Sequence, residues 1–247
     1  MAEVLTELCE MILPFHTIQK ELKRKKNSLL AHSRKNFDDF TNFFENERFK
    51  HLKPEMLFIL NILQSVESNS KDHPSLAAYC EHPFRVTIFC MNAVSSPSKV
   101  LMSTALMHNI YELSGLNEYY LTSKGVSSEV ADNIRLLTIN REFESDKLYL
   151  KDFYGHIEAS SEELTLIRCI DKLDNLMACQ LIRDQKYRCE YIELAEEFVQ
   201  PMAERLDASF GSFFQKICDH AKESDFDEIL SNVVSAKVQN TGDWNDW

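Results

Sequence analysis

Turn-forming residues are scarce in this sequence, in which glycine supplies 5 and proline 6 of the 247 residues. At an average usage of about 12% for the pair, a chain of this length would contain roughly 30 of them. All-β sandwiches and barrels need many tight turns, and nucleotide-binding βαβ folds need glycine-rich loops, so both classes are disfavoured. Hydrophobic residues make up 44% of the sequence, which is enough for a core. The sequence therefore predicts an all-α protein that folds as a compact helical bundle.

The chain is acidic, because 27 Lys and Arg residues face 39 Asp and Glu residues and give a net charge of −12. General nucleic-acid binders present a basic surface, so we expect no nucleic-acid partner. An acidic protein that handles phosphate groups needs local cations or a metal ion.

The N-terminal segment and the cysteines indicate a cytoplasmic protein. Residues 1–22 lack the basic stretch and following apolar run of a signal peptide. No stretch approaches the roughly 18 apolar residues of a membrane-spanning helix, so we expect no membrane association. The seven cysteines are odd in number, scattered and without a Cys-x-x-Cys pair. We interpret them as reduced thiols, most of which pack as small hydrophobic residues.

Several segments combine helical spacing of apolar residues with helix start signals. Proline is tolerated in the first turn of a helix, so we expect Pro54, Pro83 and Pro97 to open helices. The capping-box pattern Ser160-x-x-Glu163 predicts another helix start. The predicted helices span 54–67, 83–94, 97–113, 127–142, 160–184 and 190–207, the last with a kink or break at Pro201, and two shorter helices fill 209–236.

The first fifty residues differ in composition from the rest of the chain. They contain a basic run at 20–26, followed by phenylalanines that alternate with acidic residues. We predict a helical N-terminal extension over 1–53, a main helical domain over 54–236 and a flexible tail over 237–247. The basic run is interpreted as a solvated helix face, with a phosphate-facing or partner-binding role as the alternative.

Polar residues interrupt two apolar helices at the same spacing. His108 and Glu112 are four residues apart in one helix, and Asp171 and Asn175 repeat that spacing in another. A buried carboxylate is costly unless it is paired or binds a metal, so the two helices are predicted to face each other across a polar centre. Imidazole and carboxylate ligands together suit Mn²⁺, Fe²⁺ or Zn²⁺. For His108 alone, a satisfied core histidine is the alternative.

The order AYCEHPFRV, ALMHNIYE and LIRCIDKLDNL resembles the HD-domain metal-dependent phosphohydrolases, and within them most closely the hydrolase domain of the RelA/SpoT type. That family has the motifs YxxHPxxVA, LLHDxxED and VKLADRLxN in this order. The likeness covers roughly 76–207. The matching residues are Tyr79, His82, Pro83 and Val86 in the first motif, His108 and Glu112 in the second, and Asp171, Lys172, Leu173 and Asn175 in the third.

The resemblance implies a helical bundle of the HD-domain type and a role for each matching polar residue. By it, one divalent metal, commonly Mn²⁺, is held by His82, His108, Asn109 and Asp171. Glu112 positions or deprotonates the attacking water. Asn175 hydrogen-bonds to the substrate or to the site. Arg168 and Lys172 offset the charge of the substrate phosphate.

The sequence also departs from the family pattern. Position 109 is Asn where the family has Asp, and position 113 is Leu where the RelA/SpoT type has a second acid. Met177 stands where that type often has Arg, and the basic stretch before the first motif is missing. The leading hypothesis is a metal-dependent phosphohydrolase that acts on a phosphate or pyrophosphate ester of a nucleotide or a similar small molecule. The alternative is a catalytically impaired HD-domain protein that binds a nucleotide or a partner protein as a regulator.

Overall fold

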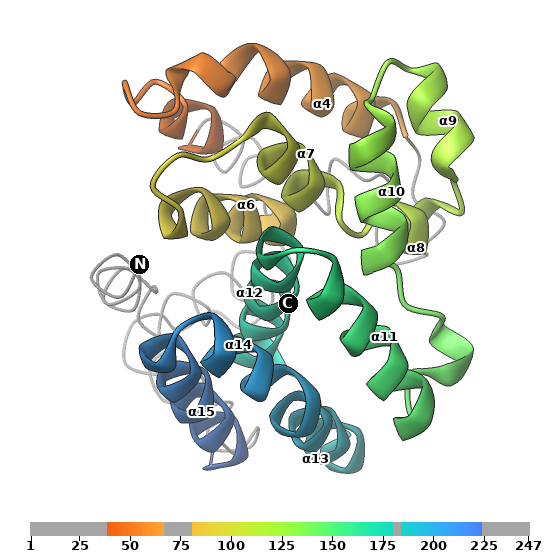
Figure 1. Cartoon of the computed structure of the whole chain (residues 1–247), viewed down its shortest axis with the longest axis vertical. Coiled ribbons are helices and arrows are strands. Elements are labelled where there is room, and N and C mark those ends of the chain that lie inside the picture. Colours follow the sequence, from red (N-terminus) through yellow and green to blue (C-terminus); the bar gives the residue numbers. More distant parts are fainter. Residues whose placement is uncertain (1–38, 67–80, 180–183, 224–247) are drawn as a thin grey trace, which may run out of the picture. The chain divides into compact units, whose positions relative to one another are not determined.

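A computed structural model describes residues 39–66, 81–179 and 184–223 of the chain (Figure 1). All the regular structure in these residues is helical, which confirms the predicted all-α class. In chain order the elements are η1 (Lys50–Leu52), α4 (Lys53–Ser65), α6 (Glu81–Ala93), α7 (Lys99–Met107), α8 (Ile110–Ser114), α9 (Glu118–Ser123), α10 (Ser128–Leu137), η2 (Arg141–Phe143), α11 (Lys147–Ser160), α12 (Glu162–Ala178), α13 (Gln185–Leu194), the π-helical turn η4 (Ala195–Val199), α14 (Gln200–Leu206) and α15 (Ala208–Glu223).

The described residues form two compact units, one up to Ile170 and the other from Asp171 onward. The boundary falls inside α12, which runs through it as one unbroken helix. The predicted division at residue 53 stays a prediction, as does the tail over 237–247. The basic run at 20–26, Tyr79 and the cysteines at positions 9 and 80 also lie outside the described residues.

Helix α7 is the central helix of the first unit. Every residue from Leu101 to Met107 is buried, and the helix packs against α4, α6 and α10 (Figure 1). A helix that is apolar on all sides is stable only where neighbours cover each of its faces. A short connection over 94–98 joins α6 to α7 as a helical hairpin. The hairpin brings the beginning of α6 next to the end of α7, where His82 and His108 lie.

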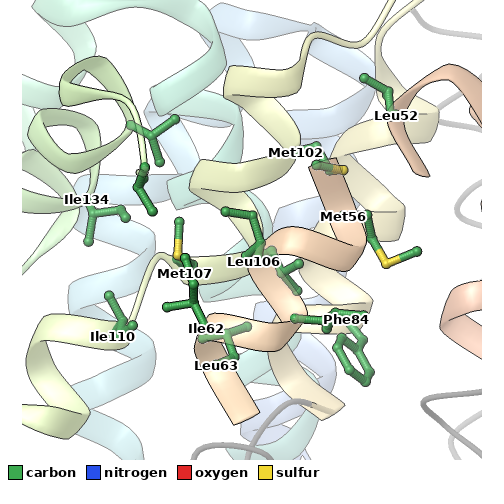
Figure 2. Close-up of a cluster of buried hydrophobic side chains, with 14 of the residues drawn as sticks. Leu52, Met56, Ile62, Leu63, Phe84, Met102, Leu106, Met107, Ile110 and Ile134 are labelled. Carbon is green, nitrogen blue, oxygen red and sulfur yellow. The ribbon is translucent and has the colours of Figure 1, made fainter. Parts of the chain in front are cut away.

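The hydrophobic core of this unit gathers side chains from α4, α6, α7, α8 and α10, and residues 40–52 contribute to it as well. Phe40 stacks on Phe84, with ring centroids 4.2 Å apart. Phe43 stacks on Phe49 at 4.4 Å. Figure 2 shows the centre of this cluster, including Leu52, Met56, Ile62, Leu63, Phe84, Met102, Leu106, Met107, Ile110 and Ile134. The core therefore encloses the helix that leads to His108.

Two of the predicted helices differ from the observed ones near the polar centre. The predicted helix 97–113 is divided into α7 and α8, because Asn109 has φ −100° and ψ 3°, outside the helical region. It also begins later than Pro97, since the Ser98 hydroxyl accepts a hydrogen bond from the Leu101 amide at 2.9 Å and caps α7. The predicted helix 127–142 ends at Leu137, after which Thr138 is extended.

Other helix boundaries shift by small amounts. Ser160 is the last residue of α11, and Ser161 caps α12 by accepting from the Leu164 amide at 3.1 Å, so the capping box predicted at Ser160 is wrong by one position. The kink or break is predicted at Pro201, but Pro201 lies in the first turn of α14, and the irregularity precedes that helix as the π-helical turn η4. Of the stretch 209–236, in which two shorter helices are predicted, the structure describes only residues up to 223, and these lie in α15; residues 224–236 lie outside the described residues.

Two helical glycines have opposite surroundings and give a prediction about stability. A Cβ atom on Gly211 in α15 would lie 2.6 Å from the Cα and 2.9 Å from the backbone nitrogen of Glu204, whereas one on Gly155 in α11 would meet no atom within 4 Å. Gly211→Ala is therefore expected to lower the free energy of unfolding by about 1–3 kcal/mol through overpacking. Gly155→Ala should raise it by up to about 1 kcal/mol, since alanine is the better helix former. Urea denaturation of both variants measures this, and a stabilised Gly211→Ala would contradict the close packing of α15 on α14.

None of the helices in the described part of the chain combines the length and the apolar character needed to cross a membrane. Five cysteines in this part are free thiols: Cys90, Cys169, Cys179, Cys189 and Cys218. Burial raises the pKa of Cys179 to about 11 and that of Cys218 to about 12. Both thiols are therefore protonated at neutral pH, which does not favour thiolate chemistry at these positions.

Candidate metal centre

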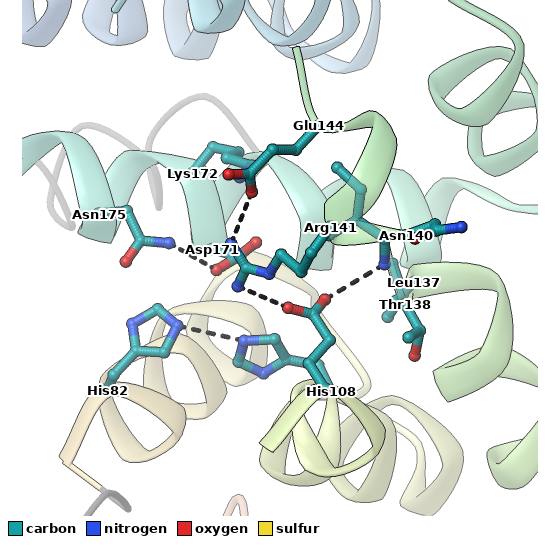
Figure 3. A network of polar contacts seen from close by, with 12 residues as sticks. His82, His108, Leu137, Thr138, Asn140, Arg141, Glu144, Asp171, Lys172 and Asn175 are labelled. Atoms are coloured by element: carbon teal, nitrogen blue, oxygen red, sulfur yellow. Dashed lines mark hydrogen bonds and ion pairs between the residues drawn. The ribbon is translucent and has the colours of Figure 1, made fainter. Parts of the chain in front are cut away.

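His82 and His108 meet at the end of the α6–α7 hairpin. Their Nε2 atoms are 3.2 Å apart, and both side chains are buried, with exposed fractions of 7% and 2%. Figure 3 shows the two rings directed at each other. The sequence-based hypothesis required these ring nitrogens to lie within about 5 Å of each other, because metal–nitrogen bonds are near 2.1 Å. The structure satisfies that requirement.

The surroundings of His108 determine which nitrogen is available for a ligand. Its Nδ1 lies 2.7 Å from the carbonyl oxygen of Ala105, which can only accept a hydrogen bond. Nδ1 therefore carries the proton, and Nε2 presents its lone pair toward His82. Metal-binding histidines usually donate their second ring N–H in this way, which fixes the tautomer.

The third member of the group is Asp171 on α12. The ligand atoms of His82, His108 and Asp171 all lie within 4.8 Å of one another, and Asp171 is buried, at 3% exposure. The side-chain amide of Asn175, one turn later on the same helix, donates to Asp171 Oδ1 at 2.9 Å (Figure 3). This bond orients the carboxylate and gives Asn175 a contact within the site, while its predicted contact with a substrate stays a prediction.

The geometry of the group fits a divalent metal. Two nitrogens bound to one ion at about 2.1 Å lie about 3.2 Å apart when the nitrogen–metal–nitrogen angle is about 100°, close to tetrahedral or octahedral values. The donors comprise two imidazoles and one anionic oxygen, a set that suits Mn²⁺, Fe²⁺ and Zn²⁺. The buried His82, His108 and Asp171 can therefore hold one metal ion.

Asn109 occupies the junction between α7 and α8 and is half-buried. Its backbone carbonyl accepts from the Leu113 amide at 3.1 Å and so begins α8. Its side chain makes no capping bond. The role of this side chain as a fourth ligand stays a prediction.

Glu112, predicted to act on the attacking water, is held by two contacts. Its Oε1 accepts from the backbone amide of Ile139 at 3.2 Å, and its Oε2 accepts from the Arg141 guanidinium at 2.7 Å. The Glu112 side chain is only 5% exposed, whereas that of Arg141 is 66% exposed. The Glu112 carboxylate is thus a buried anion, and its counter-cation, Arg141, is partly solvated. This ion pair also connects the segment after α10 to α8.

Two cations, Arg168 and Lys172, are predicted to face a phosphate. In the structure both of them interact with other parts of the protein. Arg168 is buried, donates to the Leu137 carbonyl and has its guanidinium carbon 5.2 Å from the centre of the Phe153 ring. Lys172 lies over the Tyr191 ring, with its Nζ 5.0 Å from the ring centre and 3.4 Å from the hydroxyl oxygen. A phosphate contact from Arg168 would require the side chain to leave Leu137. The phosphate roles of both residues stay predictions.

Arg141 is the site residue that the sequence pattern missed. The sequence placed it at the polar end of the helix predicted over 127–142, where an arginine is unremarkable. The chain instead leaves the helix after Leu137, and Arg141 then pairs with Glu112, 29 residues earlier. No local periodicity reports such a contact, because it depends on where two separate segments meet in space.

Comparison of the chain with protein-family models finds no match, and the same holds for curated proteins.

Proposed function

We infer that this protein is a divalent-metal-dependent phosphohydrolase, with Mn²⁺ as the first candidate metal. Its proposed substrate is a phosphate or pyrophosphate ester of a nucleotide or a similar small molecule. The observation that supports this most is the buried group of His82, His108 and Asp171, whose two ring nitrogens are 3.2 Å apart. The motif order that resembles the HD-domain phosphohydrolases adds the reaction type.

Each residue has a proposed task in this reaction. A metal held by His82, His108 and Asp171 would lower the pKa of a bound water and polarise a phosphoryl oxygen. Asn175 keeps the Asp171 carboxylate oriented. Glu112 accepts the proton of the attacking water. The water oxygen forms a bond to phosphorus, the bond from phosphorus to the leaving group breaks, and the departing oxygen takes a proton from solvent.

The test combines metal analysis with a turnover screen. The purified protein is assayed for bound Mn, Fe and Zn, and phosphate or pyrophosphate release is measured over a panel of nucleotides with added Mn²⁺. Stoichiometric metal and release that a chelator abolishes support the proposal. Absence of metal binding under these conditions overturns it.

Two observations favour a second candidate, a catalytically impaired regulator that binds a nucleotide or a partner protein. Both carboxylate oxygens of Glu112 are engaged by Ile139 and Arg141, and position 109 lacks the charge of an aspartate. This protein would bind the metal and a nucleotide but release no phosphate in the same screen.

Asn109→Asp tests the proposed fourth ligand. Aspartate has nearly the same shape as asparagine, so the change adds a negative charge with little change in packing. We expect Mn²⁺ to bind at least about tenfold more tightly, since a pair of unit charges 4 Å apart is worth about 4 kcal/mol even at an effective dielectric constant of about 20. Calorimetric titration of both proteins measures the affinity. Equal affinities would mean that residue 109 is not a ligand.

A further inference from the structure

Arg141 combines a buried anionic partner with an exposed cationic head. It begins η2, and its NH2 group donates to Glu112 Oε2 at 2.7 Å while its NH1 group donates to Glu144 Oε2 at 3.0 Å. Its side chain is nevertheless 66% exposed. The ion pair therefore holds the guanidinium beside Glu112, which is four residues from His108 in the chain, without enclosing it.

The hydrogen bonds of Arg141 leave donors available. A guanidinium has five N–H groups in a fixed plane. The contacts with Glu112 and Glu144 use one N–H each, and the remaining three have no partner among the residues described by the structure. A planar cation that keeps three N–H groups on a largely exposed side chain matches the oxygens of a phosphate, which arginine binds in a bidentate manner.

The other cations proposed for this task are already occupied by the protein. The Arg168 guanidinium is buried between the Leu137 carbonyl and the Phe153 ring. The Lys172 ammonium lies against the Tyr191 ring. Neither side chain offers the combination of exposure and remaining donors seen at Arg141.

We propose that Arg141 is the residue that binds the substrate phosphate, and that the phosphate competes with Glu112 for its guanidinium. This inference rests on the proposed phosphohydrolase function for the identity of the substrate. A phosphate dianion attracts the guanidinium more strongly than a single carboxylate does. Binding therefore weakens the contact that holds Glu112 and releases this carboxylate toward the attacking water. Arg141 thus couples occupancy of the site to the freedom of Glu112.

The experiment uses pyrophosphate as the probe and the full-length protein, both metal-free and loaded with Mn²⁺. Affinity is measured by calorimetry, and the Nε–H resonance of Arg141, identified by its loss in the variant, is followed by NMR. The variants are Arg141→Gln, Arg141→Lys and Glu112→Gln. Arg135→Gln is the matched control, because Arg135 is an exposed arginine of the same unit that pairs with Glu118 at 2.6 Å.

Competition predicts opposite effects from the two partners of one ion pair. Arg141→Gln should weaken pyrophosphate binding by at least about tenfold, the loss of one charge-assisted pair. Arg141→Lys should fall between this variant and the wild type, since it keeps the charge but not the fork. Glu112→Gln should tighten binding several-fold, because it removes the competing carboxylate. Arg135→Gln should leave the affinity unchanged, and the Arg141 resonance should move with added pyrophosphate.

A purely structural ion pair gives a different result. In that case Arg141→Gln and Glu112→Gln both lower the melting temperature while pyrophosphate affinity stays at the wild-type value, and this outcome overturns the inference. If Arg141→Gln does not fold, the proposal is tested by the shift of the Arg141 resonance in the wild type and by the pyrophosphate affinities of Arg141→Lys and Glu112→Gln. Failure of the proposed function is seen separately, as absence of Mn²⁺ binding, while the metal-free measurements still report on Arg141.

Discussion

His108→Gln is expected to abolish stoichiometric binding of Mn²⁺. His108 Nε2 lies 3.2 Å from His82 Nε2 and the residue is buried at 2% exposure, so its loss leaves the group with one imidazole and one carboxylate. Loss of groups that only support a ligand costs about 10–100-fold in metal affinity, and loss of the ligand itself should cost more. Calorimetric titration of the two proteins compares the affinities directly.

The same substitution should remove the stabilisation that the metal gives to the folded state. At a free metal concentration of 100 times the dissociation constant, binding stabilises a protein by about 2.7 kcal/mol. Mn²⁺ is therefore expected to raise the melting temperature of the wild type and to leave that of His108→Gln unchanged. His156→Gln is the control, because His156 is exposed on α11 of the same unit. Equal responses of wild type and His108→Gln would exclude His108 as a ligand.

Glu112→Gln is expected to lower turnover by about 10²–10⁴-fold, the usual contribution of a positioned general base. The amide keeps the shape of the side chain but cannot accept a proton from water. The measurement is the rate of phosphate release on the best substrate from the nucleotide screen, with the melting temperature recorded in parallel. Full activity in this variant would show that Glu112 has only a structural role.

Glu118→Gln provides the comparison for this variant. Glu118 also pairs with an arginine of the first unit, Arg135, but its side chain is 43% exposed whereas that of Glu112 is 5% exposed. We expect this variant to keep the wild-type rate. Comparing the two variants distinguishes the loss of an ion pair, which both share, from the loss of a proton acceptor, which only Glu112→Gln has. Glu112→Gln should bind pyrophosphate more tightly than the wild type and yet release phosphate from the substrate far more slowly.

The scarcity of glycine and proline was sufficient to predict the all-α class, and the spacing of polar residues was sufficient to predict a polar centre. His82 and Asp171 are 89 residues apart in the sequence, yet the order of the motifs placed them in one group with His108. The cost of an unpaired buried carboxylate supports the pairing of His108 with Asp171, whereas the placement of His82 in the group came from the resemblance of the motif order.

The helix ends near the site were less accessible to sequence reasoning. The helix predicted over 97–113 is divided at Asn109, and the one predicted over 127–142 ends at Leu137. After Leu137 the Ile139 amide bonds to the Glu112 carboxylate instead of continuing the helix. A local pattern measures only whether residues a few positions apart favour a helix, so it cannot weigh this contact with a segment 27 residues away.

By itself, then, the sequence determined that the chain is helical and that His108 and Asp171 belong to one polar centre, because periodicity and the cost of buried charge act through residue type and spacing alone. His82 joined that group only through the resemblance of the motif order. Only the tertiary structure decided which cations are available to a phosphate. Arg168 and Arg141 carry the same side chain, but the packing of α12 encloses one against Leu137 and Phe153, while the turn after α10 leaves the other two-thirds exposed beside Glu112. The physical reason is that burial and hydrogen-bond partners are properties of the folded surroundings and are absent from the identity of the residue.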